Sequence, residues 1–330
     1  MRAFGKLAGR VLMALMALMV VGIGMWLFGP YEDVSFDAAY DESKLDGGVD
    51  AYLEAREAQV LNIRDNSEKR VIWAGAVEVK TPVAVVYMHG FSASSQEIRP
   101  VPDDVAAALG ANLIYTRFQG HGRDNDAMGE STVKGWMADT VEALAIARRV
   151  GEKVLILSTS TGGTLTALAL HEPELQKDVV GVVFVSPNFG VNNGAAAMLT
   201  LPAARYWLPL LVGKTRSFEP RNAAQAREWS TTYPSTAVFP MAAAVKAAVA
   251  KDYSSVKIPA LFHYSKDDKV VRADQTLRIS AQWGGPVTTV RPQLGAGDDP
   301  SKHVIAGDII SPSQTARSVA AILKWYGELE

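Results

Sequence analysis

The stretch V-L-I-L-S-T-S-T-G-G, residues 154–163, decides which fold this sequence can adopt. An apolar run that passes through a Ser/Thr cluster into two glycines, and then into a helical pattern, predicts a buried strand that turns abruptly into a helix. Ser160 lies at the apex of that turn, where its hydroxyl would be exposed at the carboxyl edge of a sheet. Ser158 and Gly162 are small enough to leave room for the turn. Ser160 is therefore a candidate nucleophile, although an ordinary polar loop with a Ser/Thr helix cap has the same composition.

Strand-like apolar runs alternate with helical patterns on both sides of this turn. The strand-like runs are residues 83–88, 112–118, 153–157, 179–185, 259–264 and 287–291, preceded by a half-exposed alternating run at 70–79. The helical patterns are residues 99–109, 132–150, 163–171, 272–283 and 311 to 326. Runs that are apolar throughout are typical of parallel strands buried on both faces. The sequence therefore predicts an α/β fold, a mostly parallel sheet with helices on both faces, which binds ligands at the carboxyl ends of its strands.

The alternation stops over residues 188–257, which are rich in Ala, Leu, Trp and Pro and have helical spacing without a strand-like run. Residues 198–211 are unusually apolar within this insertion. Because the insertion follows the carboxyl end of strand 179–185, it would lie over the edge at which Ser160 is exposed. We expect a helical lid with an apolar inner face, rather than simply additional core.

The first 31 residues predict a membrane anchor. Three basic residues precede an uncharged apolar run, residues 11–28, which spans about 27 Å as a helix and is close to the thickness of the hydrocarbon core. The following F-G-P-Y-E-D offers no A-x-A-like cleavage site, so we expect an uncleaved anchor rather than a signal peptide. The basic flank should stay in the cytoplasm, which places the rest of the chain on the non-cytoplasmic side, the periplasm in a bacterium.

The composition argues against several other kinds of site. A net charge of −2 gives no electrostatic case for nucleic-acid binding. The absence of cysteine excludes disulfides, thiolate nucleophiles and cysteine-based zinc sites. No G-x-G-x-x-G follows the first core strand, no G-K-[ST] occurs, and the histidines are scattered without an H-E-x-x-H motif. We therefore expect neither a cofactor nor a metal, and the sequence does not indicate an oligomeric state.

A serine nucleophile needs a neutral imidazole within hydrogen-bond reach and an acid that orients this imidazole. The chain has only five histidines, so the base can be chosen by elimination. Four of them lie in a strand, at a helix end or in loops upstream of the serine: His89, His121, His171 and His263. His303 lies in a polar loop after the last strand, which opens on the same edge of the sheet as Ser160. We therefore predict that His303 is the base.

Two neighbouring residues are candidates for the acid. Asp267 and Asp268 lie in S-K-D-D-K-V-V, residues 265–271, at the carboxyl end of strand 259–264. Either carboxylate is placed to orient the imidazole of His303, and either also suits a turn or a helix cap. The residues alone leave both candidates open.

Two backbone N–H groups are predicted to form an oxyanion hole, which stabilises the charge that develops on a carbonyl oxygen. Thr161 directly follows the candidate nucleophile at the start of a helix. Phe91 lies in the loop after strand 83–88, where Gly90 allows a close backbone approach and His89 precedes it.

These motifs together resemble those of the α/β-hydrolase family. They are H-G-F at 89–91, G-H-G at 120–122, S-T-S-T-G at 158–162, D-K-V-V at 268–271 and S-K-H-V at 301–304. They follow the family's chain order of nucleophile, acid and base, and the resemblance extends over residues 70–328. It is greatest to the monoacylglycerol-lipase and serine-aminopeptidase-like branch. In this family an x-Val-Val-like run usually follows the acid, which favours Asp268 over Asp267, and a serine nucleophile argues against the family's dehalogenases and epoxide hydrolases.

The resemblance implies a serine hydrolase that cleaves carboxylic esters of hydrophobic or acyl-chain substrates through an acyl-enzyme. The implied residues are the triad Ser160, His303 and Asp268, the oxyanion donors Phe91 and Thr161, and the supporting residues His89, Gly90 and Gly162. A peptidase or an acyltransferase with the same triad stays an alternative, as does a catalytically silent anchored binding protein.

The expected domain organisation has three parts. Residues 1–31 form the anchor, which contacts a lipid membrane through residues 11–28, and residues 32–69 form a tether with a short helix. Residues 70–330 form the α/β-hydrolase domain, with the lid insertion at about 188–257.

Overall fold

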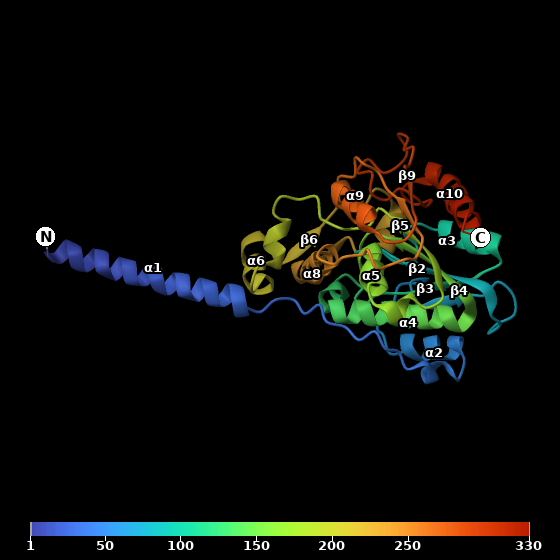
Figure 1. Cartoon of the computed structure of the whole chain (residues 1–330), viewed down its shortest axis with the longest axis horizontal. Coiled ribbons are helices and arrows are strands. Elements are labelled where there is room, and N and C mark those ends of the chain that lie inside the picture. The colour runs from blue at the N-terminus through green and yellow to red at the C-terminus, as the bar shows by residue number, and fades with distance from the viewer. Residues whose placement is uncertain (1, 330) are drawn as a thin grey trace.

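Seven strands form the central sheet of this protein, whose computed structural model describes residues 2–329 (Figure 1). They are β1 (Arg70–Ile72), β2 (Thr81–Met88), β3 (Asn112–Tyr115), β4 (Gly151–Thr159), β5 (Val179–Val185), β8 (Ala260–His263) and β9 (Val287–Val290). Their order across the sheet is β1-β3-β2-β4-β5-β8-β9, and β1 alone pairs antiparallel to its neighbour. The predicted mostly parallel sheet is confirmed.

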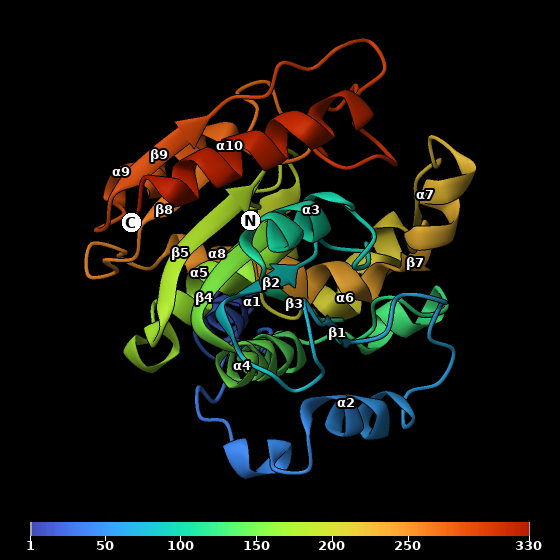
Figure 2. The same ribbon diagram turned by 90° about the vertical axis from the view of Figure 1, so that its right-hand side faces the viewer.

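Helices cover both faces of the sheet, as predicted (Figure 2). One face carries α3 (Val101–Leu109) and α10 (Thr315–Gly327), and the other carries α4 (Val133–Val150), α5 (Thr161–Leu170), α8 (Val238–Val249) and α9 (Ala273–Gln282). The central strand β2 alternates between two hydrophobic clusters, with Val85 and Tyr87 facing α3 and α10, and Val86 and Met88 facing the other helices. This alternation explains the continuous apolar run, because a strand buried on both faces needs apolar side chains at every position.

Two helix ends follow from local sequence. The Thr132 hydroxyl accepts a hydrogen bond from the N–H of Gly135 at 2.9 Å and so caps the start of α4. Gly110 ends α3 in the left-handed conformation, at φ 59°, which glycine adopts without steric cost. Short 3-10 helices link the other elements: η1 (Glu42–Leu45), η2 (Asp126–Glu130), η3 (Pro173–Gln176), η4 (Ala196–Thr200), η5 (Ser235–Ala237) and η6 (Pro312–Gln314).

The half-exposed strand predicted for residues 70–79 is much shorter in the structure. β1 pairs with β3, and its last residue Ile72 lies opposite Leu113, near the start of that strand. The pairing of the two strands ends at this point. The N–H of Ala74 instead donates to the side-chain carbonyl of Asn112 at 2.9 Å, so the predicted boundary of 79 was wrong.

The insertion at 188–257 contains α6 (Ala204–Val212), α7 (Ala223–Glu228) and α8, as the helical spacing indicated. It also contains two short antiparallel strands, β6 (Thr215–Ser217) and β7 (Thr232–Pro234), which the sequence pattern did not indicate. Three residues are too few to produce a recognisable alternation, so only the folded chain reveals this pairing.

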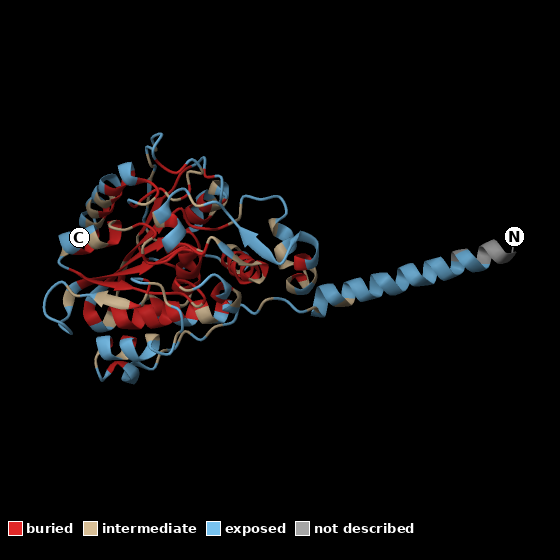
Figure 3. Ribbon diagram, turned by 180° about the vertical axis from the view of Figure 1, so that it is seen from behind, coloured by how far each residue is buried: buried red, intermediate tan, exposed pale blue. Residues whose placement is uncertain are grey.

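The helix α1 (Arg2–Phe28) projects from the domain (Figure 3). Its segment Gly9–Phe28 is apolar, unburied and long enough to cross a membrane. After it, the short helix α2 (Val49–Glu57) packs against the domain, with Val49 and Leu53 buried in the same hydrophobic cluster as α4. The side chain of Lys69 bonds both Asp139 and Glu142 of α4, so residues 32–69 are attached to the domain by apolar and ionic contacts.

Candidate active site

A sharp turn between β4 and α5 presents Ser160. Its backbone lies at φ 50° and ψ −116°, a region that non-glycine residues rarely adopt. The surrounding chain holds this conformation, because the Ser160 N–H donates to the Val185 carbonyl at 3.0 Å and its own carbonyl accepts from Asn188 at 2.9 Å. Two residues earlier, the Ser158 hydroxyl donates to the Val183 carbonyl at 3.0 Å. Ser158 therefore fits the turn as a small residue and also bonds the neighbouring strand.

The turn has no room for a side chain at Gly162. A Cβ atom at position 162 would lie 2.1 Å from the carbonyl oxygen of Met88 and 2.6 Å from that of His89. We expect Gly162→Ala to lower the free energy of unfolding by about 3 kcal/mol, because backbone of β2 would have to move. Urea unfolding measures the change. Gly297→Ala is the matched control, because a Cβ there meets no atom within 4 Å; equal stability of the two variants would contradict the prediction.

Ser160, His303 and Asp268 form a continuous hydrogen-bonded chain. The Ser160 Oγ lies 3.0 Å from Nε2 of His303, and Nδ1 of His303 lies 2.8 Å from Oδ2 of Asp268. The other carboxylate oxygen of Asp268 accepts the N–H groups of Val270 and Val271 at 2.8 and 2.9 Å. All three side chains are buried. In this geometry the imidazole of His303 can accept the proton of the serine hydroxyl, and the Asp268 carboxylate can orient that imidazole.

The structure separates the two neighbouring aspartates. The Asp268 side chain is 2% exposed and faces His303, whereas the Asp267 side chain is 53% exposed and pairs with Lys302 at 2.9 Å. That ion pair keeps the pKa of Asp267 below its usual value. The carboxylate of Asp299 accepts the N–H groups of His303 and Val304, so it shapes the histidine loop rather than contacting the imidazole.

Two of the remaining histidines, His263 and His89, bond groups other than Ser160. His263 lies in β8, where it contacts Ser318 and the Val290 carbonyl, and burial lowers its pKa to about 4. Burial also lowers the pKa of His89 to about 4. The His89 ring accepts the N–H of Phe118 and donates to the carbonyl of Gly90, which supports the loop that carries Phe91.

The loop after β2 and the start of α5 contribute Phe91 and Thr161 to the cavity that Ser160 lines. Thr161 is the first residue of α5, and the first N–H groups of a helix have no partner within the helix. The N–H of Gly90 donates to Oε2 of Glu97 at 2.7 Å, while that of Phe91 has no partner among residues 2–329. Within the described part of the chain, both N–H groups are therefore free to donate to an oxyanion, the role proposed for Phe91 and Thr161 from the sequence.

Glu97 is a site residue that sequence reasoning missed. It is buried, lines the pocket and accepts hydrogen bonds from the Gly90 N–H and from the Tyr87 hydroxyl at 3.0 Å. Burial raises the pKa of Glu97 to about 7. Nothing in the sequence marks this residue, because its approach to the loop depends on how residues 92–98 fold back.

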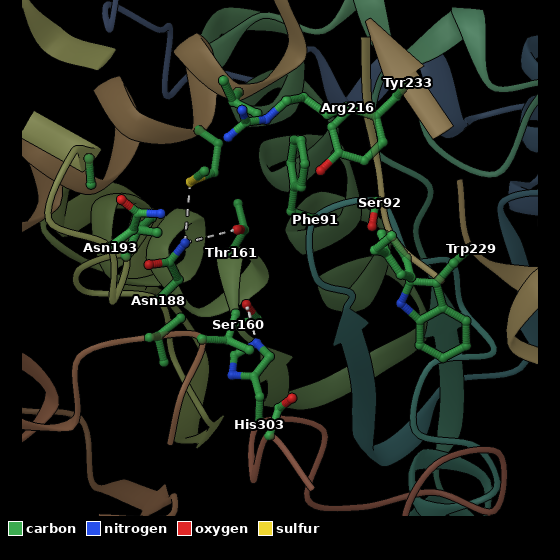
Figure 4. Close-up of a pocket in the computed structure, with 18 of the residues that line it drawn as sticks. Phe91, Ser92, Ser160, Thr161, Asn188, Asn193, Arg216, Trp229, Tyr233 and His303 are labelled. Carbon is green, nitrogen blue, oxygen red and sulfur yellow. Dashed lines mark hydrogen bonds between the residues drawn. The ribbon is translucent and has the colours of Figure 1, made fainter. Parts of the chain in front are cut away.

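A cavity of about 690 Å³ opens above Ser160 (Figure 4). Figure 4 shows Ser160 directed toward the His303 ring, with Phe91 and Tyr233 on the far side of the space. The insertion supplies most of the apolar wall, through Met198, Leu199, Leu208, Phe218, Trp229, Tyr233, Val238, Phe239 and Met241. Among residues 2–329, no group of three or more His, Asp or Glu side chains is placed to hold a metal ion.

The protonation of His303 should set the acid limit of activity. Burial by itself would lower its pKa, but the charge and hydrogen bond of Asp268, together with the charges of Glu97 and Asp299, outweigh burial and raise the pKa above its ordinary value. Only the neutral imidazole accepts the serine proton, so kcat/KM should fall as the pH is lowered, with a midpoint above about 6.5. A pH profile with a short soluble ester measures this.

Glu97→Gln is the control for that profile, because Glu97 itself has a pKa of about 7. The charge of Glu97 also helps to raise the pKa of His303, so the variant should keep the acid limit with a slightly lower midpoint if His303 is the titrating group. A midpoint below that of an ordinary histidine, or one that disappears in Glu97→Gln, would contradict the assignment.

Comparisons with known proteins agree with this architecture. The family described as serine aminopeptidase, S33, matches residues 80–291. A thermostable monoacylglycerol lipase from Bacillus sp. (strain H-257) is 30% identical over 118 residues, which are 36% of this chain and 45% of that enzyme. The chain therefore matches less than half the length of this relative.

Several solved structures share the fold at low identity. One of the metagenome-derived lipolytic enzymes LipS and LipT superposes with a TM-score of 0.60 at 21% identity, over 80% of this chain and 100% of that chain. A soluble variant of monoglyceride lipase from Saccharomyces cerevisiae gives 0.59 at 11% identity, over 80% and 92%. A Paleococcus ferrophilus monoacylglycerol lipase gives 0.56 at 14% identity, over 79% and 98%. The chain has the α/β-hydrolase fold and belongs to the serine aminopeptidase S33 family.

Proposed function

We propose that this protein hydrolyses carboxylic esters of hydrophobic or acyl-chain substrates through an acyl-enzyme on Ser160. The observation that carries the proposal is the 3.0 Å contact between Ser160 Oγ and His303 Nε2 at the base of a largely apolar cavity. The monoacylglycerol lipase relative and the lipolytic structural neighbours support the same chemistry.

Acylation begins when the Ser160 hydroxyl gives its proton to Nε2 of His303 and Oγ attacks the ester carbonyl carbon. The negative charge that moves onto the carbonyl oxygen is stabilised by the N–H groups of Phe91 and Thr161. Asp268 stabilises the imidazolium. Collapse of the intermediate breaks the bond to the alcohol oxygen, which leaves with the proton from Nε2.

Deacylation repeats these steps with water. Nε2 of His303 removes a proton from the water, whose oxygen attacks the acyl carbon. Collapse breaks the bond to Ser160 Oγ, and the proton returns from His303 to the serine oxygen. The net reaction consumes one ester and one water, and it yields an acid and an alcohol.

The insertion at 188–257 acts in this proposal as a lid over the cavity, because its side chains form the apolar wall above Ser160. The apolar helix α1 acts in this proposal as a membrane anchor. The basic residues that precede its apolar segment favour a catalytic domain on the non-cytoplasmic side. An anchored enzyme with an apolar cavity suits substrates that come from lipid.

A series of p-nitrophenyl esters of increasing acyl length, with monoacylglycerols and aminoacyl amides alongside, tests the proposal. We expect kcat/KM to rise with chain length by up to about fourfold per methylene until the cavity is full, since each buried methylene contributes about 0.8 kcal/mol. Faster cleavage of the amides would favour a peptidase, and transfer of the acyl group to alcohols in preference to water would favour an acyltransferase. Failure of a fluorophosphonate probe to label Ser160 would indicate a catalytically silent protein.

A further inference from the structure

The segment that follows α1 is fastened to the insertion. The N–H of Ala203, directly before α6, donates to the carbonyl of Pro30 at 2.8 Å. The guanidinium of Arg205 forms a bidentate ion pair with the carboxylate of Glu32, with contacts of 2.5 and 2.9 Å. The two partners of this pair are 173 residues apart in the chain. Both contacts attach the segment that directly follows α1 to α6.

The two sides of α6 have different surroundings although both are apolar. Leu208 and Pro209 are buried, and both line the cavity above Ser160. Tyr206, Leu210 and Leu211 point outward and are 68%, 72% and 72% exposed. We call these three residues the outer face of α6. Adjacent exposed apolar side chains of this size mark a surface that another partner covers.

The position of the outer face favours a lipid bilayer as that partner. Figure 1 shows α6 beside the end of α1, on the side of the domain from which α1 projects. A bilayer spanned by Gly9–Phe28 would therefore have its surface at α6. Lys214 follows α6 and is exposed, so it is available to anionic lipid headgroups. A second copy of the chain would explain the apolar face but not its position beside α1.

We propose that the outer face of α6 rests in the surface of the bilayer that α1 spans, and that the Glu32–Arg205 pair holds it there. This inference rests on the membrane anchor and the lid proposed above, and it specifies which helix of the lid contacts the bilayer. Because Leu208 and Pro209 of the same helix line the cavity, one side of α6 contacts lipid while the other faces Ser160. An ester substrate then passes from the bilayer past α6 without crossing water.

Single-cysteine labelling tests the bilayer contact, since the chain has no cysteine of its own. An environment-sensitive fluorophore is attached to the cysteine of the full-length Leu210→Cys variant. The labelled protein is reconstituted in vesicles of equal parts phosphatidylcholine and phosphatidylglycerol. Lys324→Cys is the control, because Lys324 is exposed on α10 at the opposite end of the domain (Figure 1). We expect lipids with a nitroxide near the headgroup to quench the probe at 210 several-fold more strongly than the probe at 324.

Equal quenching at the two positions would overturn the proposal. Shielding of the probe at 210 from both nitroxide lipid and aqueous iodide would also overturn it, because this result indicates contact between copies of the chain.

A charge exchange tests the role of the ion pair. In the Leu210→Cys background, Glu32→Arg places two cations side by side and should reduce quenching at 210 toward the level at 324. The double variant Glu32→Arg with Arg205→Glu restores opposite charges and should restore quenching. Unchanged quenching in Glu32→Arg would show that the pair does not hold α6 at the membrane.

Hydrolysis of a short soluble ester is measured in parallel for every variant. Absence of this activity in the unsubstituted protein would refute the proposed function, while the quenching result would still test the bilayer contact. Normal activity with no difference in quenching would refute only the bilayer contact.

Discussion

Ser160→Ala is expected to lower kcat/KM for ester hydrolysis by at least about 10⁴-fold. The variant loses the hydroxyl oxygen that lies 3.0 Å from His303 Nε2, so no acyl-enzyme can form. The residual rate would come from the oxyanion donors and from substrate binding alone. Steady-state kinetics with a soluble p-nitrophenyl ester measure the loss, and covalent labelling by a fluorophosphonate should disappear with it.

Ser280→Ala is the matched control for this experiment. Its hydroxyl is also largely buried, but it donates to the Leu277 carbonyl within α9, away from the cavity. We expect wild-type kinetics and full labelling for this variant. Wild-type activity in Ser160→Ala, or loss of activity in both variants, would refute the assignment of the nucleophile.

Asp268→Asn is expected to lower kcat by about 10³- to 10⁴-fold, whereas Asp267→Asn should change it less than about twofold. An amide at position 268 removes the negative charge that stabilises the imidazolium, and it can present an N–H to Nδ1, which favours the wrong tautomer of His303. The Asp267 carboxylate instead pairs with the exposed Lys302, and exposed ion pairs contribute little.

The two aspartates therefore make a matched pair of variants that differ by one position in the chain. Kinetics are measured on both after thermal unfolding has shown that each is folded. Similar losses in the two variants would mean that the loop as a whole, and not the contact between Asp268 and His303, supports catalysis.

The fold could be predicted from the sequence because its signals are local. Apolar runs of strand length between amphipathic helices indicate a parallel sheet, and a parallel sheet brings the carboxyl ends of its strands to one edge. For this reason Ser160 and His303, 143 residues apart, could be placed together from loop positions alone. Because the chain has only five histidines, few residues had to be considered as the catalytic base.

Features that depend on which way a side chain points could not be predicted in the same way. Asp267 and Asp268 have the same chemistry and adjacent positions, so the residues alone could not separate them, and the preference for Asp268 came from the resemblance to a family. Glu97 reaches the Gly90 N–H only because the loop after β2 folds back, and no local pattern describes that path. The strands β6 and β7 are too short to leave a periodic signal.

By itself, then, the sequence determined the order of strands and helices, the sharp turn at Ser160 and the apolar character of residues 11–28, because each depends on neighbouring residues. Only the tertiary structure decided which carboxylate faces His303, how the insertion encloses the cavity, and that Glu32 pairs with Arg205 beside α6. These contacts join distant parts of the chain, and their geometry is set by packing rather than by the composition of any one segment.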